Sequence, residues 1–245
     1  MKKTLHWGRL LFIGLATGLA LVAIFSIATP SGYAATVAAA NSPYVLLAWN
    51  DLGMHCYNLD FKDIAVLPPY NNLWAQVVKI GDPPQIITTG VSVSYAFPDN
   101  TYSVGKTNFW TYAQPLFGLK APLTPNIGLT GKGLAGSMDV KADHFQADGI
   151  PLTEYSDSAP TVRNPFQLAT VIATDTRTGQ EIARLTTVAP VSTEMHCDNC
   201  HNDNGRAARG IATGNVSTNI LTLHDQDIGT DLMGSRPVLC ASCHA

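Results

Sequence analysis

Two short cysteine–histidine clusters carry the clearest chemical signal in this 245-residue chain. Residues 197–201 read CDNCH and residues 240–244 read CASCH, so the pattern Cys-x-x-Cys-His occurs twice. Closely spaced thiols beside an imidazole can exchange disulfides, bind zinc or tether a prosthetic group. The rest of the chain has to decide between these three chemistries.

The first two chemistries fit the pattern poorly. A thiol–disulfide oxidoreductase places Cys-x-x-Cys at a helix start in a βαβ setting, and no such setting surrounds either cluster. A zinc site could take four thiolates from the two pairs. However, 39 residues separate Cys200 from Cys240, against roughly 15–20 in the usual zinc pattern. Zinc also gives no reason for a histidine to follow each pair.

Covalent haem attachment accounts for every position of the repeat. Two thiols separated by two residues can bond to the two vinyl groups of one haem, and the adjoining histidine can bind the iron. The sequence therefore predicts two covalently attached c-type haems with their iron. The first would be held by Cys197, Cys200 and His201, and the second by Cys240, Cys243 and His244.

Each iron has a second axial position, and several side chains could fill it. We predict His224, which is expected on a loop between the two clusters, with Asp225 and Asp227 orienting its ring. His55 could be a ligand or a structural histidine in a turn, and both interpretations stay open. His196 is poorly placed for its own haem but could bind the other iron. His144 is expected to be a solvated loop residue. The alternative ligands are four methionines, namely Met54, Met138, Met195 and Met233.

With these residues in view, the chain resembles exported multihaem c-type cytochromes of bacteria that respire anaerobically. The similar stretches are NDLGMHCYNLDF (50–61), GKTNFW (105–110), TEMHCDNCH (193–201) and RPVLCASCHA (236–245). The resemblance implies electron transfer, commonly with two histidines on each iron, and it supplies no substrate. Only Ala245 follows His244, so we expect either a fragment of a longer multihaem protein or a further subunit that closes the second site.

Three functions remain to be weighed. The first is an electron carrier in a respiratory or extracellular chain, whose partners are redox proteins, including other multihaem cytochromes. The second is a haem enzyme, such as a peroxidase or a reductase of small oxyanions, which needs an open iron site with acid–base groups above it. The third is a binding module with an aromatic cleft around Trp49, Trp74 and Trp110. Spare histidines are plentiful and no acid–base group stands out, so the sequence favours the carrier over the enzyme.

The elements that must position the clusters are predicted to be mainly β. Residues 44–49, 91–97, 168–174 and 182–188 read as strands, and the last two flank a turn with Asp175 and Gly179, which indicates a hairpin. We expect a β-sandwich-like domain over residues 41–193. Residues 112–155 are predicted to be long connections without helices. Residues 194–245 form a loop-rich or short-helical segment with too few large apolar residues for a core of its own.

The N-terminus and the overall charge indicate an exported protein. Lys2, Lys3 and Arg9 precede an apolar run, so residues 1–34 are predicted to be a signal peptide that directs the chain to the periplasm or the outside. An uncleaved membrane anchor is the alternative. Without this segment 12 basic and 18 acidic residues remain, a net charge near −6, with no basic patch for nucleic acid. The leftover thiol of Cys56 is expected to be buried and inert.

Overall fold

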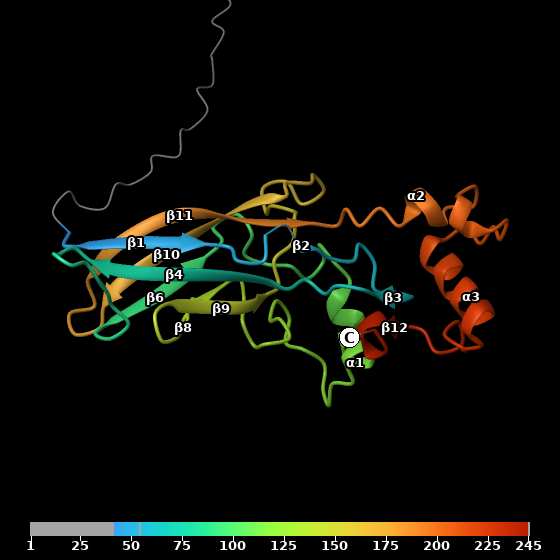
Figure 1. Cartoon of the computed structure of the whole chain (residues 1–245), viewed down its shortest axis with the longest axis horizontal. Coiled ribbons are helices and arrows are strands. Elements are labelled where there is room, and N and C mark those ends of the chain that lie inside the picture. Colours follow the sequence, from blue (N-terminus) through green and yellow to red (C-terminus); the bar gives the residue numbers. More distant parts are fainter. Residues whose placement is uncertain (1–41, 54, 245) are drawn as a thin grey trace, which may run out of the picture. The chain divides into compact units, whose positions relative to one another are not determined.

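The computed structural model describes residues 42–53 and 55–244 (Figure 1). The predicted signal peptide, residues 1–34, and the candidate ligand Met54 lie outside this range. Strands dominate the described part, so the prediction of a mainly β protein is confirmed. No helix among these residues has the length and apolar character needed to cross a membrane.

Two five-stranded sheets and one two-stranded ladder organise the strands. In the first sheet, β1 (Tyr44–Trp49), β4 (Asn71–Lys79), β9 (Phe145–Ile150) and β8 (Asp139–Val140) are neighbours in that order, and β5 (Gln85–Ile86) also pairs with β4. The second sheet has the order β2 (His55–Cys56), β11 (Glu181–Ser192), β10 (Phe166–Asp175), β6 (Val91–Ala96) and β7 (Ala135–Ser137). The third pairs β12 (Val238–Leu239) with β3 (Ile64–Ala65).

The core lies on the inward faces of the two larger sheets, because their strands alternate. Leu73, Ala75 and Val77 of β4 are fully buried, and so are Ala169, Val171 and Ala173 of β10. A strand places residues two apart on one face, so each strand contributes an apolar row. Strands β10 and β11 form the predicted antiparallel hairpin, with Leu168 opposite Val188.

The expectation of helix-free connections over residues 112–155 is wrong. Helix α1 (Phe109–Phe117) begins just before this range, and β7, β8 and β9 lie within it. The helix contains Pro115, which argued against it, but Phe109, Ala113 and Leu116 are buried at helical spacing. Gly118 ends the helix with a left-handed φ of 59°.

After β11 the chain becomes helical. A one-turn helix α2 (Asp198–His201) and a 3-10 turn η1 (Arg206–Ala208) lead to helix α3 (Val216–Ile228), and β12 is followed by the 3-10 turn η2 (Cys240–Ser242). Strand β11 ends one residue before the predicted domain boundary at residue 193. We call residues 194–244 the C-terminal segment.

Candidate functional site

The first Cys-x-x-Cys-His cluster is folded as a single helical turn. Cys197 caps helix α2, and the amide of His201 donates to the Cys197 carbonyl at 2.9 Å. Residues three apart on a helix lie on one side, so Cys197 and Cys200 share a face and His201 follows directly. Cys197 is half-buried and Cys200 is exposed. This arrangement presents two thiols and an imidazole from five consecutive residues.

A buried amide fixes the ring of His201. Its Nδ1 lies 2.9 Å from Oδ1 of Asn219 on α3, and Asn219 is fully buried. The Nδ2 group of Asn219 donates to the carbonyl of Ile211 at 2.9 Å, so Oδ1 is the atom that faces the imidazole. The ring therefore carries its hydrogen on Nδ1 and keeps the lone pair of Nε2 for a metal, as metal-binding histidines usually do.

The second cluster has a similar local geometry. Turn η2 follows β12 directly, and the amide of His244 donates to the carbonyl of Cys240 at 3.1 Å. Cys243 and His244 are exposed, whereas Cys240 is half-buried. Burial raises the pKa of the Cys240 thiol, and the charge of Cys197 acts in the same direction.

His224 faces His244, as a pair of axial ligands would. The ring centres lie 6.2 Å apart and the planes are inclined at 86°. A nitrogen that binds a metal lies about 2.0 Å from it and the ring centre roughly 1 Å further, so two imidazoles on opposite sides of one metal have centres about 6 Å apart. Aromatic rings in edge-to-face contact can have the same separation. The separation alone therefore does not identify a ligand pair, and the hydrogen bonds of His224 must be considered as well.

Those hydrogen bonds leave Nε2 of His224 available. Nδ1 lies 2.9 Å from Oγ1 of Thr230, and this hydroxyl donates to Oδ1 of Asp225 at 2.7 Å. Asp225 is thus linked to the ring through Thr230, which the sequence did not single out. Asp227 instead forms an ion pair with Arg209 at 2.9 Å.

Helix α3 serves both clusters. The loop predicted for His224 is wrong, because the residue lies within this 13-residue helix, just before its last turn. Asn215 caps its start by accepting from the amide of Thr218, and Gly229 ends it with φ +72°. Asn219 and His224 are five residues apart, so they lie roughly 140° apart around the axis. One side of the helix therefore holds His201 and another presents His224.

The β3–β12 ladder holds the second cluster in place. Strand β12, immediately before Cys240, runs parallel to β3 with Val238 opposite Ile64. An ion pair strengthens the attachment, since Nη1 of Arg236 lies 3.0 Å from Oδ1 of Asp63, whose side chain is 10 % exposed. The position of Cys240 is thus set by a strand 175 residues earlier in the chain.

A buried carboxylate anchors the approach to the first cluster. Glu154 is 1 % exposed and accepts from both the amide and the hydroxyl of Thr193, three residues before His196. Nε of Arg163 lies 3.3 Å from the same carboxylate and compensates its charge. A buried charge is tolerated only when it is paired in this way. Glu154 therefore fixes the chain where β11 gives way to the C-terminal segment.

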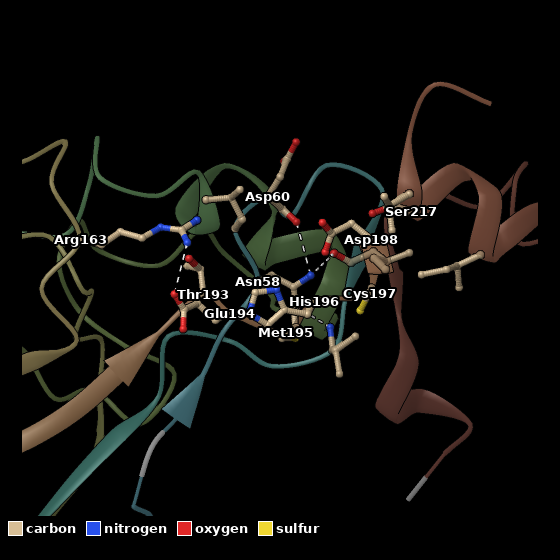
Figure 2. A pocket seen from close by; sticks show the side chains of 15 residues that line it. Asn58, Asp60, Arg163, Thr193, Glu194, Met195, His196, Cys197, Asp198 and Ser217 are labelled. Carbon is tan, nitrogen blue, oxygen red and sulfur yellow. Dashed lines mark hydrogen bonds and ion pairs between the residues drawn. The ribbon is translucent and has the colours of Figure 1, made fainter. Parts of the chain in front are cut away.

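A cavity of about 480 Å³ lies beside Cys197, and we call it the junction cavity. Figure 2 shows Arg163 and Glu194 toward one end and Cys197, Asp198 and Ser217 toward the other. The apolar part of its lining consists of Leu59, Ile64, Val66, Met195, Val216 and Ile220. Leu59 is 60 % and Val66 38 % exposed, so these side chains border the cavity without being covered.

One asparagine shapes the wall of the junction cavity. The buried side chain of Asn58 donates to the carbonyl of Ile64 at 3.2 Å and accepts from the amides of Val66 and Leu67 at 2.7 and 3.1 Å. These bonds hold the loop that carries Leu59 and Val66 in one conformation. The wall is therefore preformed.

The remaining candidate ligands are differently placed. Nε2 of His55 lies 2.8 Å from the carbonyl of Pro68, and burial lowers the pKa of this ring. His55 thus has a backbone partner at one nitrogen, which both a structural histidine and a metal-binding histidine can have. His196 and Met195 both line the junction cavity, and His196 has a left-handed backbone with φ +52°. Met138 is buried in the core.

His144 and Cys56 both have side-chain partners in the strand-rich part of the chain. The prediction of a solvated His144 is wrong, because the ring stacks on Trp74 at 4.1 Å and its side chain is 15 % exposed. Trp49 lies 6.2 Å from Trp74, while Trp110 packs against Phe109 on α1. Cys56 is half-buried, with Sγ 3.3 Å from Oγ of Ser192.

The geometry also bears on the zinc alternative. Within the described residues, no three His, Cys, Asp or Glu side chains are gathered in a group that could hold a metal ion. The four motif thiols are free, and two of them are exposed.

Comparisons with known protein families, with curated proteins and with solved structures find no match to this chain. The interpretation of the site thus depends on the motifs and on the geometry above. Sequence reasoning missed Asn219 and Thr230. The capping signals Asn215 and Gly229, which bracket α3, could have shown that Asn219 lies in a helix and that Thr230 follows its end.

Proposed function

We propose that this protein is an exported dihaem c-type cytochrome that carries electrons in a respiratory or extracellular chain. The repeated Cys-x-x-Cys-His motif is the observation that carries the proposal. The geometry supports it, because each motif is one tight turn and His201 keeps Nε2 free for a metal. The iron of each haem c would supply one-electron chemistry when bound.

The residues of the chain have distinct roles in this proposal. Cys197 and Cys200 tether one haem, and Cys240 and Cys243 tether the other. His201 and His244 are the proximal ligands, each following its second thiol. His224 would be the second histidine to hold the iron tethered beside His244, and the 6.2 Å between the two ring centres supports this assignment. Two nitrogen ligands on one iron suit electron transfer, because they leave no position open for a substrate.

The junction cavity would accommodate the haem tethered by Cys197. Its apolar side chains Leu59, Ile64 and Val66 come from the strand-rich part of the chain before residue 194, which we call the β-domain, and Val216 and Ile220 come from α3. Side chains that are exposed around a concavity gain free energy when an apolar group covers them, by about 25 cal/mol for each Å² buried. The cavity would also exclude water from one face of the ring.

A haem enzyme is the second candidate, and the junction cavity favours it at the first site only. Asp60, Glu194 and His196 line the cavity beside Cys197 and could exchange protons with a small ligand. An open sixth position there would leave one iron available for a peroxide or an oxyanion. His196, Met195 and His55 are the alternatives that would close that position.

Location and partners follow from the same proposal. The N-terminal sequence supports export to the periplasm or beyond, and a membrane association would arise only if that segment is uncleaved. The partners would be redox proteins, including other multihaem cytochromes, and no nucleic acid.

A single preparation can test the function. The exported protein, produced in a host that attaches c-type haem, should keep two haems after denaturation, because thioether bonds survive unfolding. Replacing Cys197 and Cys200 together by Ser should leave one. A low-spin reduced spectrum that carbon monoxide does not change would support the carrier, and a high-spin fraction would support the enzyme. A protein with bound zinc and no added haem mass would refute both.

A further inference from the structure

A hydroxyl relay connects a carboxylate to the ring of His224. Gly229, in the left-handed conformation, turns the chain back after α3 so that Thr230 lies beside His224. Oγ1 of Thr230 is 2.9 Å from Nδ1 of His224 and 2.7 Å from Oδ1 of Asp225. The three groups form a short chain of hydrogen bonds.

The direction of these bonds follows from what each group can donate. A hydroxyl has one hydrogen, and that of Thr230 goes to the Asp225 carboxylate, which can only accept. The hydroxyl oxygen must then accept from Nδ1 of His224. Asp225 is itself held in place by the amides of Leu232 and Met233, at 2.7 and 2.9 Å. The relay therefore ends on a fixed negative charge.

We propose that Thr230 is a positioning residue that passes part of the Asp225 charge to His224 and so lowers the reduction potential of one of the two haems. This inference rests on the proposed function. A stronger acceptor at Nδ1 makes Nε2 a better donor, which favours ferric over ferrous iron. His201 differs, because its Nδ1 donates to the neutral amide of Asn219. The hydrogen bonds of His224 thus lead to a charged carboxylate, whereas those of His201 lead to a neutral amide.

The test is a redox titration of the holoprotein carrying Thr230→Val, which keeps the β-branched shape and removes the hydroxyl. Loss of a hydrogen-bonding partner of a metal ligand typically changes metal affinity by 10- to 100-fold. A tenfold change in the ferric preference would raise one midpoint potential by about 59 mV and leave the other where it is. Thr230→Ser should restore the lower value, because the hydroxyl returns.

Thr222→Val is the matched control. Thr222 is half-buried on the same helix, two residues before His224 and on the opposite side of the axis. It should change neither potential. Unchanged potentials in Thr230→Val, or equal shifts in Thr230→Val and Thr230→Ser, would overturn the relay. Failure of the proposed function would be seen separately, since the unmodified protein would then lack covalent haem.

Discussion

Asn219→Leu should reveal how strongly helix α3 is coupled to the first cluster. Leu has nearly the shape of Asn but no polar atoms, so the substitution removes both hydrogen bonds of a fully buried side chain. The lost bonds go to Nδ1 of His201 and to the carbonyl of Ile211, each at 2.9 Å. The ring of His201 would lose the contact that fixes its orientation.

The magnitude follows from these two bonds. A buried hydrogen bond contributes about 0.5–1.5 kcal/mol net, so the loss of two should lower the free energy of unfolding by about 2 kcal/mol. Urea unfolding of the holoprotein, followed by circular dichroism, would measure this as a lower midpoint at an unchanged slope. We also expect a larger high-spin fraction, because a freely rotating His201 binds iron less firmly.

Two further variants make the result decisive. Asn219→Asp keeps an acceptor for His201 but turns a second oxygen toward the Ile211 carbonyl, so stability should fall while the low-spin spectrum persists. Asn199→Leu is the control, because Asn199 is exposed on α2 and should change stability by less than about 0.5 kcal/mol. If Asn219→Leu were no more destabilising than Asn199→Leu, the coupling described here would not exist.

Three other predictions concern the second cluster, the domain boundary and pH. His224→Ala should keep both haems attached but make one iron partly high-spin, able to bind carbon monoxide and higher in potential, while His144→Ala should do none of this. If His55→Ala or His196→Ala disturbs the low-spin spectrum and His224→Ala does not, the ligand assignment is wrong. Residues 41–193 alone should give a β-rich circular dichroism spectrum, and a largely disordered spectrum would refute the boundary. Burial raises the pKa of the Asp157 carboxyl, but hydrogen bonds from Lys106 and Thr101 lower it by more, so the pKa lies below its usual value. The charged Asp157 carboxylate therefore stabilises the folded protein above the usual pKa of Asp, and this stabilisation is lost as pH falls through the lowered pKa of Asp157. Asp157→Asn should lower the free energy of unfolding at pH 7, and in acid its stability should approach that of the unmodified protein.

The strands could be predicted where the sequence has an apolar run or a β-rich pattern with turn residues, and could not where the signals conflict. Residues 44–49 and the hairpin around Asp175 have clear patterns, and both are strands. Helix α1 was missed because Pro115 counts against a helix, yet burial of Phe109, Ala113 and Leu116 outweighs that cost. Here tertiary packing determines the local conformation, and local sequence alone does not predict tertiary packing.

In the candidate site, too, local features could be predicted from the sequence and distant contacts could not. The two Cys-x-x-Cys-His motifs are local, so sequence alone identified them. The partners of their histidines are not local, since Asn219 lies 18 residues after His201. Thr230 lies only six residues after His224, but it reaches the ring because Gly229 reverses the chain direction. Sequence reasoning chose Asp225 for its charge, whereas the structure inserts a hydroxyl between this charge and the ring.

The C-terminal segment depends on other parts of the molecule for its order. Among the described residues after 193, only Ala208, Leu221 and Leu223 are buried apolar side chains, too few for an independent core. The β-domain supplies part of what is missing through the β3–β12 ladder and the ion pair of Arg236 with Asp63. The exposed Leu59 and Val66 beside the junction cavity lack a cover. A covalently attached apolar ring would provide that cover at the point where Cys197 could tether it, so the packing deficit and the thiol motif point to the same kind of group.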